Sequence, residues 1–194
     1  MFFYLFTIII NTVIIIFANY FLYPPVEKSF SLVIFSLIVV GLVILEIVID
    51  SIFATVVRWI LPEKLFSEDK TFYCAKKKEM RFYEKLGIKK WKDKVLELGA
   101  VTGFRKNKLQ DTSSIEYVKR FILECNYGII VHVCCIVFGF TVMLFSLFTP
   151  VFYATLHISL VNLFLNVLPI FILRYNLPKL HVLYKYNLKK SKSN

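Results

Sequence analysis

The chain has 194 residues, of which 58% are hydrophobic, and its formal net charge is +11. A mean hydropathy of +0.66 excludes an ordinary soluble domain of this length. The basic residues cluster beside long apolar runs, which favours anionic lipid and anionic cofactors over nucleic acid as partners.

Four apolar segments reach the roughly 20 residues that a membrane-spanning helix needs. They lie at residues 2–23, 31–61, 121–148 and 151–173. Pro24 ends the first segment in a tight turn, and Pro62 ends the second. We therefore predict an all-α integral membrane protein with four transmembrane helices in a single membrane domain.

The distribution of Lys and Arg predicts the orientation of these helices. Residues 62–120 carry 16 Lys and Arg against nine acids, and residues 174–194 carry six Lys and Arg and no acid. Such an excess marks the cytoplasmic side of a membrane. We expect the segment, the tail and both termini to face the cytoplasm.

The segment 62–120 has the composition of a membrane-surface element. Residues 76–94 alternate lysines with aromatic and aliphatic residues, a pattern typical of an amphipathic interfacial helix. Its cation clusters, at 89–94 and 105–108, suit either anionic lipid or the phosphates of a nucleotide-bearing cofactor such as coenzyme A. Ser113 and Glu116 have capping-box spacing and predict the start of a helix that continues into the third span.

The end of the chain predicts a helix stop. Arg174 follows the last apolar run, and Asn176 precedes Leu177-Pro178, a sequence that suits a turn. We expect the basic tail to be disordered at its end.

Polar side chains in three of the four predicted spans fall at matching depths. At 1.5 Å per residue from the nearest cytoplasmic boundary, Glu46, His132 and Asn162 each lie about 18 Å into the membrane. Asp50 and Asn166 each lie about 12 Å in. Since polar groups at such depths are costly in lipid, one shared polar pocket is the simplest interpretation.

The residue types in this set suit proton removal from a hydroxyl group. Glu46 and Asp50 are four residues apart and share a helix face, so His132 is predicted to pair with one of them. The carboxylate would orient the ring, and the ring would act as general base. Two buried carboxylates repel each other and need a functional reason. For His132 alone and for the asparagines, the alternative is that they only link helices.

The four cysteines give no sign of a disulfide framework or a zinc site. They are Cys74, Cys125, Cys134 and Cys135, and they contain no CxxC pair. We expect buried structural thiols and no metal or bound cofactor.

Three blocks of sequence resemble a known enzyme family. They are Tyr83-Glu84-Lys85-Leu86-Gly87-Ile88-Lys89-Lys90-Trp91-Lys92-Asp93, then Glu124 with His132 eight residues later, and finally Asn166-Val167-Leu168-Pro169 followed by Arg174-Tyr175-Asn176-Leu177-Pro178-Lys179-Leu180. Together they resemble the glycosyl-4,4'-diaponeurosporenoate acyltransferases, small bacterial membrane enzymes of staphyloxanthin-type carotenoid synthesis.

The resemblance implies transfer of a fatty acyl group from acyl-CoA or acyl carrier protein to a sugar hydroxyl of a membrane glycolipid or glycosylated carotenoid. We predict three groups of site residues: catalytic His132, Glu46, Asp50 and Glu124; donor-binding Trp91, Lys92, Arg105, Lys106 and Arg174; and acceptor-binding Asn162, Asn166 and Asn176. The alternative is a non-enzymatic membrane protein, either a small proton- or cation-coupled transporter or an accessory subunit that binds lipid or a partner protein.

Overall fold

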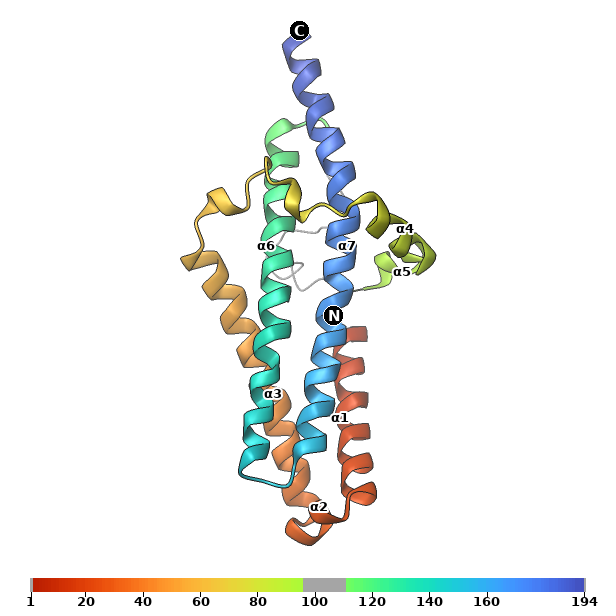
Figure 1. The fold of residues 1–194 in the computed structure, drawn as a ribbon, viewed down its shortest axis with the longest axis vertical. Helices are drawn as coiled ribbons and strands as arrows, with labels where there is room; N and C mark the ends of the chain where they lie inside the picture. Colours follow the sequence, from red (N-terminus) through yellow and green to blue (C-terminus); the bar gives the residue numbers. More distant parts are fainter. Residues whose placement is uncertain (1, 96–110, 194) are drawn as a thin grey trace. The chain divides into compact units, whose positions relative to one another are not determined.

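The computed structural model describes residues 2–95 and 111–193, and these contain helices and no β-strand. The α-helices are α1 (Phe2–Leu22), α2 (Pro24–Ser29), α3 (Leu32–Ile60), α4 (Lys77–Lys85), α5 (Ile88–Trp91), α6 (Ile115–Gly139) and α7 (Phe152–Ser193). The 3₁₀ segments are η1 (Glu63–Leu65), η2 (Thr71–Tyr73), η3 (Lys92–Lys94) and η5 (Phe140–Leu147). Figure 1 shows the course of the chain.

Four helical stretches are long and apolar enough to cross a membrane: Leu5–Leu22, Leu32–Ile60, Ile115–Leu147 and Phe152–Lys192. Large apolar side chains along them are exposed, including those of Ile9, Phe17, Leu37 and Phe164. Exposed apolar side chains on helices suit contact with lipid, where only a helix satisfies its own backbone hydrogen bonds. The prediction of an all-α protein with four transmembrane helices is confirmed.

The start of α6 lies one residue later than the sequence indicated. The Ser114 hydroxyl accepts a hydrogen bond from the Tyr117 N–H at 3.2 Å, so Ser114 is the capping residue. Ser113 instead interacts with Asp111, whose Oδ1 accepts hydrogen bonds from the backbone N–H and the hydroxyl of Ser113. Asp111 thus stabilises the turn before the helix, and the predicted capping box at Ser113 is wrong.

The predicted helix stop at Asn176 is also wrong, because α7 runs through Pro169 and Pro178 to Ser193. A proline inside a helix costs roughly 3 kcal/mol. Packing after the second proline opposes that cost, since Leu180 is buried and the Asn187 side chain donates a hydrogen bond to the Thr112 carbonyl at 2.8 Å. Tertiary contacts of this kind are not visible in a local turn signature.

The contacts within the chain define two compact units. The first comprises residues 1–55 and 133–167, and the second comprises residues 56–132 and 168–194. In the first unit a buried core joins α1, α2 and α3 to η5 and the start of α7; it includes Ile15, Val26, Phe35, Val39, Leu42, Val142, Val151, Ala154 and Ile158.

The second unit holds the segment between α3 and α6 against α6 and the end of α7. Asn126 of α6 is fully buried, and its side-chain amide donates a hydrogen bond to the Phe66 carbonyl at 2.8 Å. The Phe66 ring stacks on Tyr127 with centroids 3.8 Å apart. A second cluster packs Ala75, Tyr83 and Ile88 against α7. The part of this segment that the structure describes is therefore docked at Phe66, Ala75, Tyr83 and Ile88.

Candidate functional site

A buried carboxyl pair lies on α3 in the first unit. Glu46 and Asp50 are one helical turn apart, and Glu46 is only 5% exposed. No residue in the described part of the chain makes a hydrogen bond of normal geometry to either Glu46 oxygen or to Oδ1 of Asp50. Buried acceptors of this kind are costly unless a donor reaches them, so they indicate a binding position.

An asparagine ladder on α7 faces these carboxyl groups. The Asn166 amide donates to Asn162 Oδ1 at 2.6 Å and, more weakly, to Asp50 Oδ2 at 3.4 Å. The Asn162 amide donates to the backbone carbonyl of Cys135 on α6 at 3.1 Å. The predicted match in depth between Asp50 and Asn166 is thereby confirmed. The two amides hold this polar cluster in place, and the Asn162 amide also lies beside the Glu46 carboxyl group.

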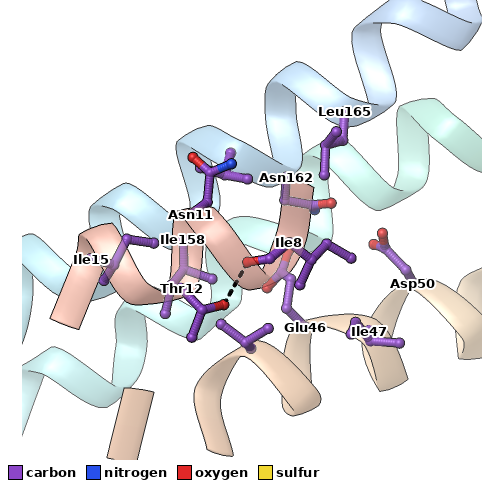
Figure 2. Close-up of a pocket in the computed structure, with 12 residues that line it drawn as sticks. Ile8, Asn11, Thr12, Ile15, Glu46, Ile47, Asp50, Ile158, Asn162 and Leu165 are labelled. Atoms are coloured by element: carbon purple, nitrogen blue, oxygen red, sulfur yellow. Dashed lines mark hydrogen bonds between the residues drawn. The ribbon is translucent and has the colours of Figure 1, made fainter. Parts of the chain in front are cut away.

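The carboxyl groups line a small cavity of about 50 Å³ in the first unit (Figure 2). Its polar lining comes from Asn11 and Thr12 of α1, Glu46 and Asp50 of α3, and Asn162 of α7, and the rest is aliphatic. Asn11 and Thr12 donate to backbone carbonyls one turn earlier in α1, so their oxygens can still accept. A cavity of this size admits a hydroxyl group or a few water molecules.

Gly139, at the end of α6, makes the tightest approach to this cluster. A Cβ built on Gly139 would overlap both Asn162 Nδ2 and Glu46 Oε1. Sequence reasoning missed Gly139, because a glycine in an apolar run gives no signal of what lies opposite it. The close approach places Asn162 directly beside Glu46.

We expect Gly139→Ala to reduce activity more than stability. The added methyl must displace the ends of two side chains, which costs roughly 1 kcal/mol or more. A displacement of the Glu46 carboxyl by about 1 Å would lower acyl transfer by up to about 100-fold. The matched control is Gly41→Ala in α3, because a Cβ there meets nothing within 4 Å. Equal activity of the two variants would contradict the placement of Glu46 in the reaction.

His132 belongs to the second unit, where it is the last residue of the stretch 56–132, whereas Glu46 and Asp50 belong to the first unit. Its side chain lies on α6 and is half-buried. The partnership of His132 with Glu46 or Asp50 therefore stays a prediction.

Glu124 forms an ion pair with Arg58 inside the second unit. The Arg58 guanidinium donates to both carboxylate oxygens, at 2.7 and 3.3 Å, and lies over the Tyr127 ring at 5.3 Å. This two-point contact fixes the Glu124 carboxylate next to the end of α3. The arrangement suits electrostatic positioning, and the predicted catalytic role of Glu124 remains a prediction.

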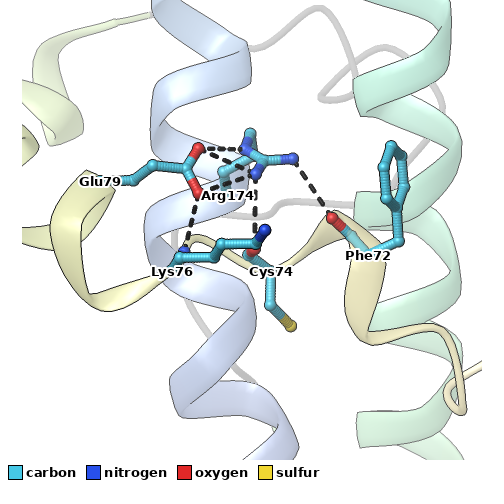
Figure 3. A network of polar contacts seen from close by, with 5 residues as sticks. All are labelled: Phe72, Cys74, Lys76, Glu79 and Arg174. Atoms are coloured by element: carbon cyan, nitrogen blue, oxygen red, sulfur yellow. Dashed lines mark hydrogen bonds and ion pairs between the residues drawn. The ribbon is translucent and has the colours of Figure 1, made fainter.

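Arg174 of α7 holds the segment after η2 in place (Figure 3). Its Nη2 donates to both Glu79 oxygens at 2.9 and 3.0 Å, and Nε donates to Oε1 at 3.2 Å. Further contacts at 3.4 Å reach the carbonyls of Phe72 and Cys74. In return, the Ala75 N–H donates to the Arg174 carbonyl at 3.1 Å. Sequence reasoning identified Arg174 but missed Glu79, its partner 95 residues away.

Because Glu79 ionises, we expect the free energy of unfolding to depend on pH. Burial alone would raise the pKa of Glu79, but the Lys76 N–H and the Arg174 guanidinium outweigh burial and lower the pKa below its usual value. Because the pKa of Glu79 is lower in the folded state, its ionised carboxylate stabilises the fold at pH values above the unfolded-state pKa, which is near 4.5. This stabilisation is lost as the pH falls through the folded-state pKa. We expect Glu79→Gln to lower the free energy of unfolding by about 1 kcal/mol or less at pH 7, since Glu79 is 35% exposed.

The measurement for Glu79 is thermal unfolding of the wild type and the variant in detergent from pH 7 to pH 3.5. The difference between them should be constant down to about pH 5 and shrink below that. Glu84→Gln is the matched control, because its partner Lys89 is exposed and the change should be small. A difference that persisted unchanged at the lowest pH would contradict the role of Glu79 ionisation.

Three of the remaining predicted donor-binding and acceptor-binding residues lie in the described part of the second unit. Trp91 ends α5, where its indole N–H donates to the Leu86 carbonyl at 3.0 Å, and Lys92 follows in η3. Asn176 is half-buried on α7. Arg105 and Lys106 lie outside the described residues. Within the described ranges the four cysteines form no disulfide, and no cluster of His, Cys, Asp and Glu is suited to hold a metal ion.

The fold and the polar cluster define a multi-pass helical membrane protein with a carboxyl–amide pocket inside the predicted membrane spans. The model of one enzyme family, glycosyl-4,4'-diaponeurosporenoate acyltransferase, matches residues 62–186. The chain belongs to this family and is an acyltransferase. No curated protein and no solved structure is similar enough to count as a match.

The matched range bears on the candidate residues. It contains Glu124, His132, Asn162, Asn166 and Arg174, whereas Glu46 and Asp50 lie before it. The family match therefore assigns an activity but does not itself include the α3 carboxyl groups.

Proposed function

We propose that this protein moves a fatty acyl group from an acyl thioester to a sugar hydroxyl of a glycosylated carotenoid or a related membrane glycolipid. The family match supports acyl transfer in the synthesis of carotenoid glycosyl esters. The four apolar helices support an acceptor that is itself dissolved in the membrane. The donor and the individual acceptor are parts of the proposal.

The single observation that supports binding of an acceptor hydroxyl here is the buried position of Glu46 at the cavity. Both of its oxygens are buried and border the cavity, where the Asn162 amide lies beside Oε1. A sugar hydroxyl is a donor of the right size for this position. The cavity is too small for an acyl chain, so the chains of both substrates would lie in the surrounding lipid.

The proposed reaction is one acyl transfer. The acceptor hydroxyl oxygen attacks the thioester carbonyl carbon, and its proton passes to a general base, for which we propose His132. A C–O ester bond forms, the C–S bond breaks, and the thiolate leaves and takes up a proton. Glu46 would hold the hydroxyl, and Asn166 holds Asp50 in place in the same unit. That one of these carboxyl groups acts together with His132 is the part of the proposal that comes from the sequence.

We propose that the donor is acyl-CoA or acyl carrier protein and that it approaches from the cytoplasm, with both chain termini on that side of the bacterial cell membrane. Support comes from the excess of Lys and Arg in residues 62–120 and 174–194. Trp91, Lys92, Arg105 and Lys106 would bind the donor's phosphates. Arg174 would position the segment after η2, because its donors are directed at Glu79 and two carbonyls.

The test is reconstitution of the full chain in phospholipid nanodiscs with a glycosylated carotenoid acid and acyl-CoA, followed by mass spectrometry of the products. We expect a new ester and an equivalent amount of free CoA. In a parallel experiment, the lipids of cells with and without the gene are compared, and a missing acylated glycolipid would identify the natural acceptor. Acyl-CoA consumed with water alone as acceptor, and no lipid ester lost from the cells, would overturn the proposal.

A further inference from the structure

Helix α4 has two different faces. One face is buried in the second unit, where Tyr83, together with Ile88 of α5, packs against Ile172 and Tyr175 of α7. The Tyr83 ring lies 4.9 Å from the Phe171 ring. The adjoining face, about 100° around the helix, carries Phe82, which is 51% exposed, and is continued by the C-cap residue Leu86, which is 46% exposed. Large apolar groups one helical turn apart on an uncovered face require an explanation.

The height of α4 along α7 is fixed by its contacts. It packs at residues 171–175, where the apolar run 151–173 ends and Arg174 provides the first charge. The Glu79–Arg174 contact anchors α4 there. The exposed Phe82 ring is also edge-on to Phe171, with centroids 6.2 Å apart. Phe82 therefore lies beside the last apolar turn of a predicted membrane span.

The charges around this face complement an anionic surface. Lys78 and Lys85 lie four residues before and three residues after Phe82 and so flank it on the helix surface. The exposed bases of α4 and α5 are Lys77, Lys78, Arg81, Lys85, Lys89 and Lys90. Their long side chains can extend from the apolar boundary into a layer of phosphate groups.

We propose that α4 is an interfacial helix, whose Phe82 and Leu86 enter the acyl region of the leaflet at the Arg174 end of α7 and whose bases bind the phosphates of anionic lipids. An apolar face with flanking bases, held at the end of a membrane span, has the composition of an in-plane lipid-binding helix. Each base near an anionic leaflet adds roughly 1 kcal/mol of attraction. Gly87, in the left-handed conformation at φ 67°, turns the chain after this face and returns Ile88 to the buried cluster. This proposal does not depend on the identity of the acyl donor or acceptor.

The test measures contact between this face and lipid in the full chain. Phe82→Trp is placed in nanodiscs of phosphatidylcholine and phosphatidylglycerol whose acyl chains carry bromine close to the headgroup, and its fluorescence is compared with that in unbrominated discs. The signal of the two native tryptophans, Trp59 and Trp91, is subtracted using the wild type. The matched control is Glu84→Trp, which is also exposed but lies about 160° around the helix from Phe82 and is not one of the bases.

We expect about a twofold loss of Phe82→Trp emission in brominated discs and little loss for Glu84→Trp. The quenching should weaken when phosphatidylglycerol is replaced by phosphatidylcholine. Equal quenching of the two variants, or none in Phe82→Trp, would overturn the proposal and indicate that another protein covers this face. Quenching of Phe82→Trp that was identical in both lipid mixtures would overturn the role assigned to the bases.

Discussion

His132→Ala is expected to lower acyl transfer by about 100- to 10,000-fold, the usual contribution of a positioned general base. The imidazole is the one side chain among the predicted catalytic residues whose unperturbed pKa lies near neutral pH. Removing a half-buried ring from α6 should leave the four apolar helices assembled. The measurement is the initial rate of ester formation in nanodiscs, with thermal unfolding recorded on the same samples.

The matched control is His157→Ala. His157 lies on α7 in the first unit, where its Nδ1 is 3.2 Å from the side-chain amide of Asn19, and it plays no part in the proposed reaction. We expect its activity to stay near that of the wild type. Near-normal activity of His132→Ala at near-normal stability would refute His132 as the general base, whatever the fate of the other predictions.

Glu46→Gln is expected to lower acyl transfer by about 100-fold or more. The substitution keeps the size of the side chain but replaces one acceptor oxygen by an amide donor and removes the possibility of a negative charge. A hydroxyl that donates to Glu46 would lose its best acceptor, and an interaction with developing charge is worth several kcal/mol in a site shielded from water. The same ester-formation assay measures the effect. The control is Glu27→Gln, at an exposed position in α2, and we expect its rate of ester formation to equal that of the wild type.

Combining the two substitutions tests the sequence prediction that His132 and a carboxyl group of α3 act together. If they serve one step, the double variant should lose little more activity than His132→Ala alone, because residues acting as a unit are not additive. Losses that multiplied would show that the two residues act independently. Full activity of Glu46→Gln would confine the chemistry to the residues within the family match, 62–186.

The sequence by itself determined the membrane spans, and with them the fold class. Runs of about 20 apolar residues force helices in lipid wherever they occur, so span positions follow from local composition without knowledge of partners. Helix periodicity also placed Glu46 and Asp50 on one face, and counting residues from the span ends predicted that Asp50 and Asn166 lie at one level. The family resemblance likewise depended on short blocks that can be read locally, and the family match confirms it.

Only the tertiary structure decided the contacts between residues distant in sequence. The sequence could not predict the two ion pairs, Arg174–Glu79 and Arg58–Glu124, or the approach of Gly139 to Glu46. It also could not predict that on α4 Tyr83 is buried while its neighbour Phe82 is exposed. The continuation of α7 through Pro178 belongs to the same group, since packing beyond the proline opposes its local cost. The physical reason is common to all: periodicity specifies which residues share a face, whereas the neighbour that meets this face depends on how the chain folds in three dimensions.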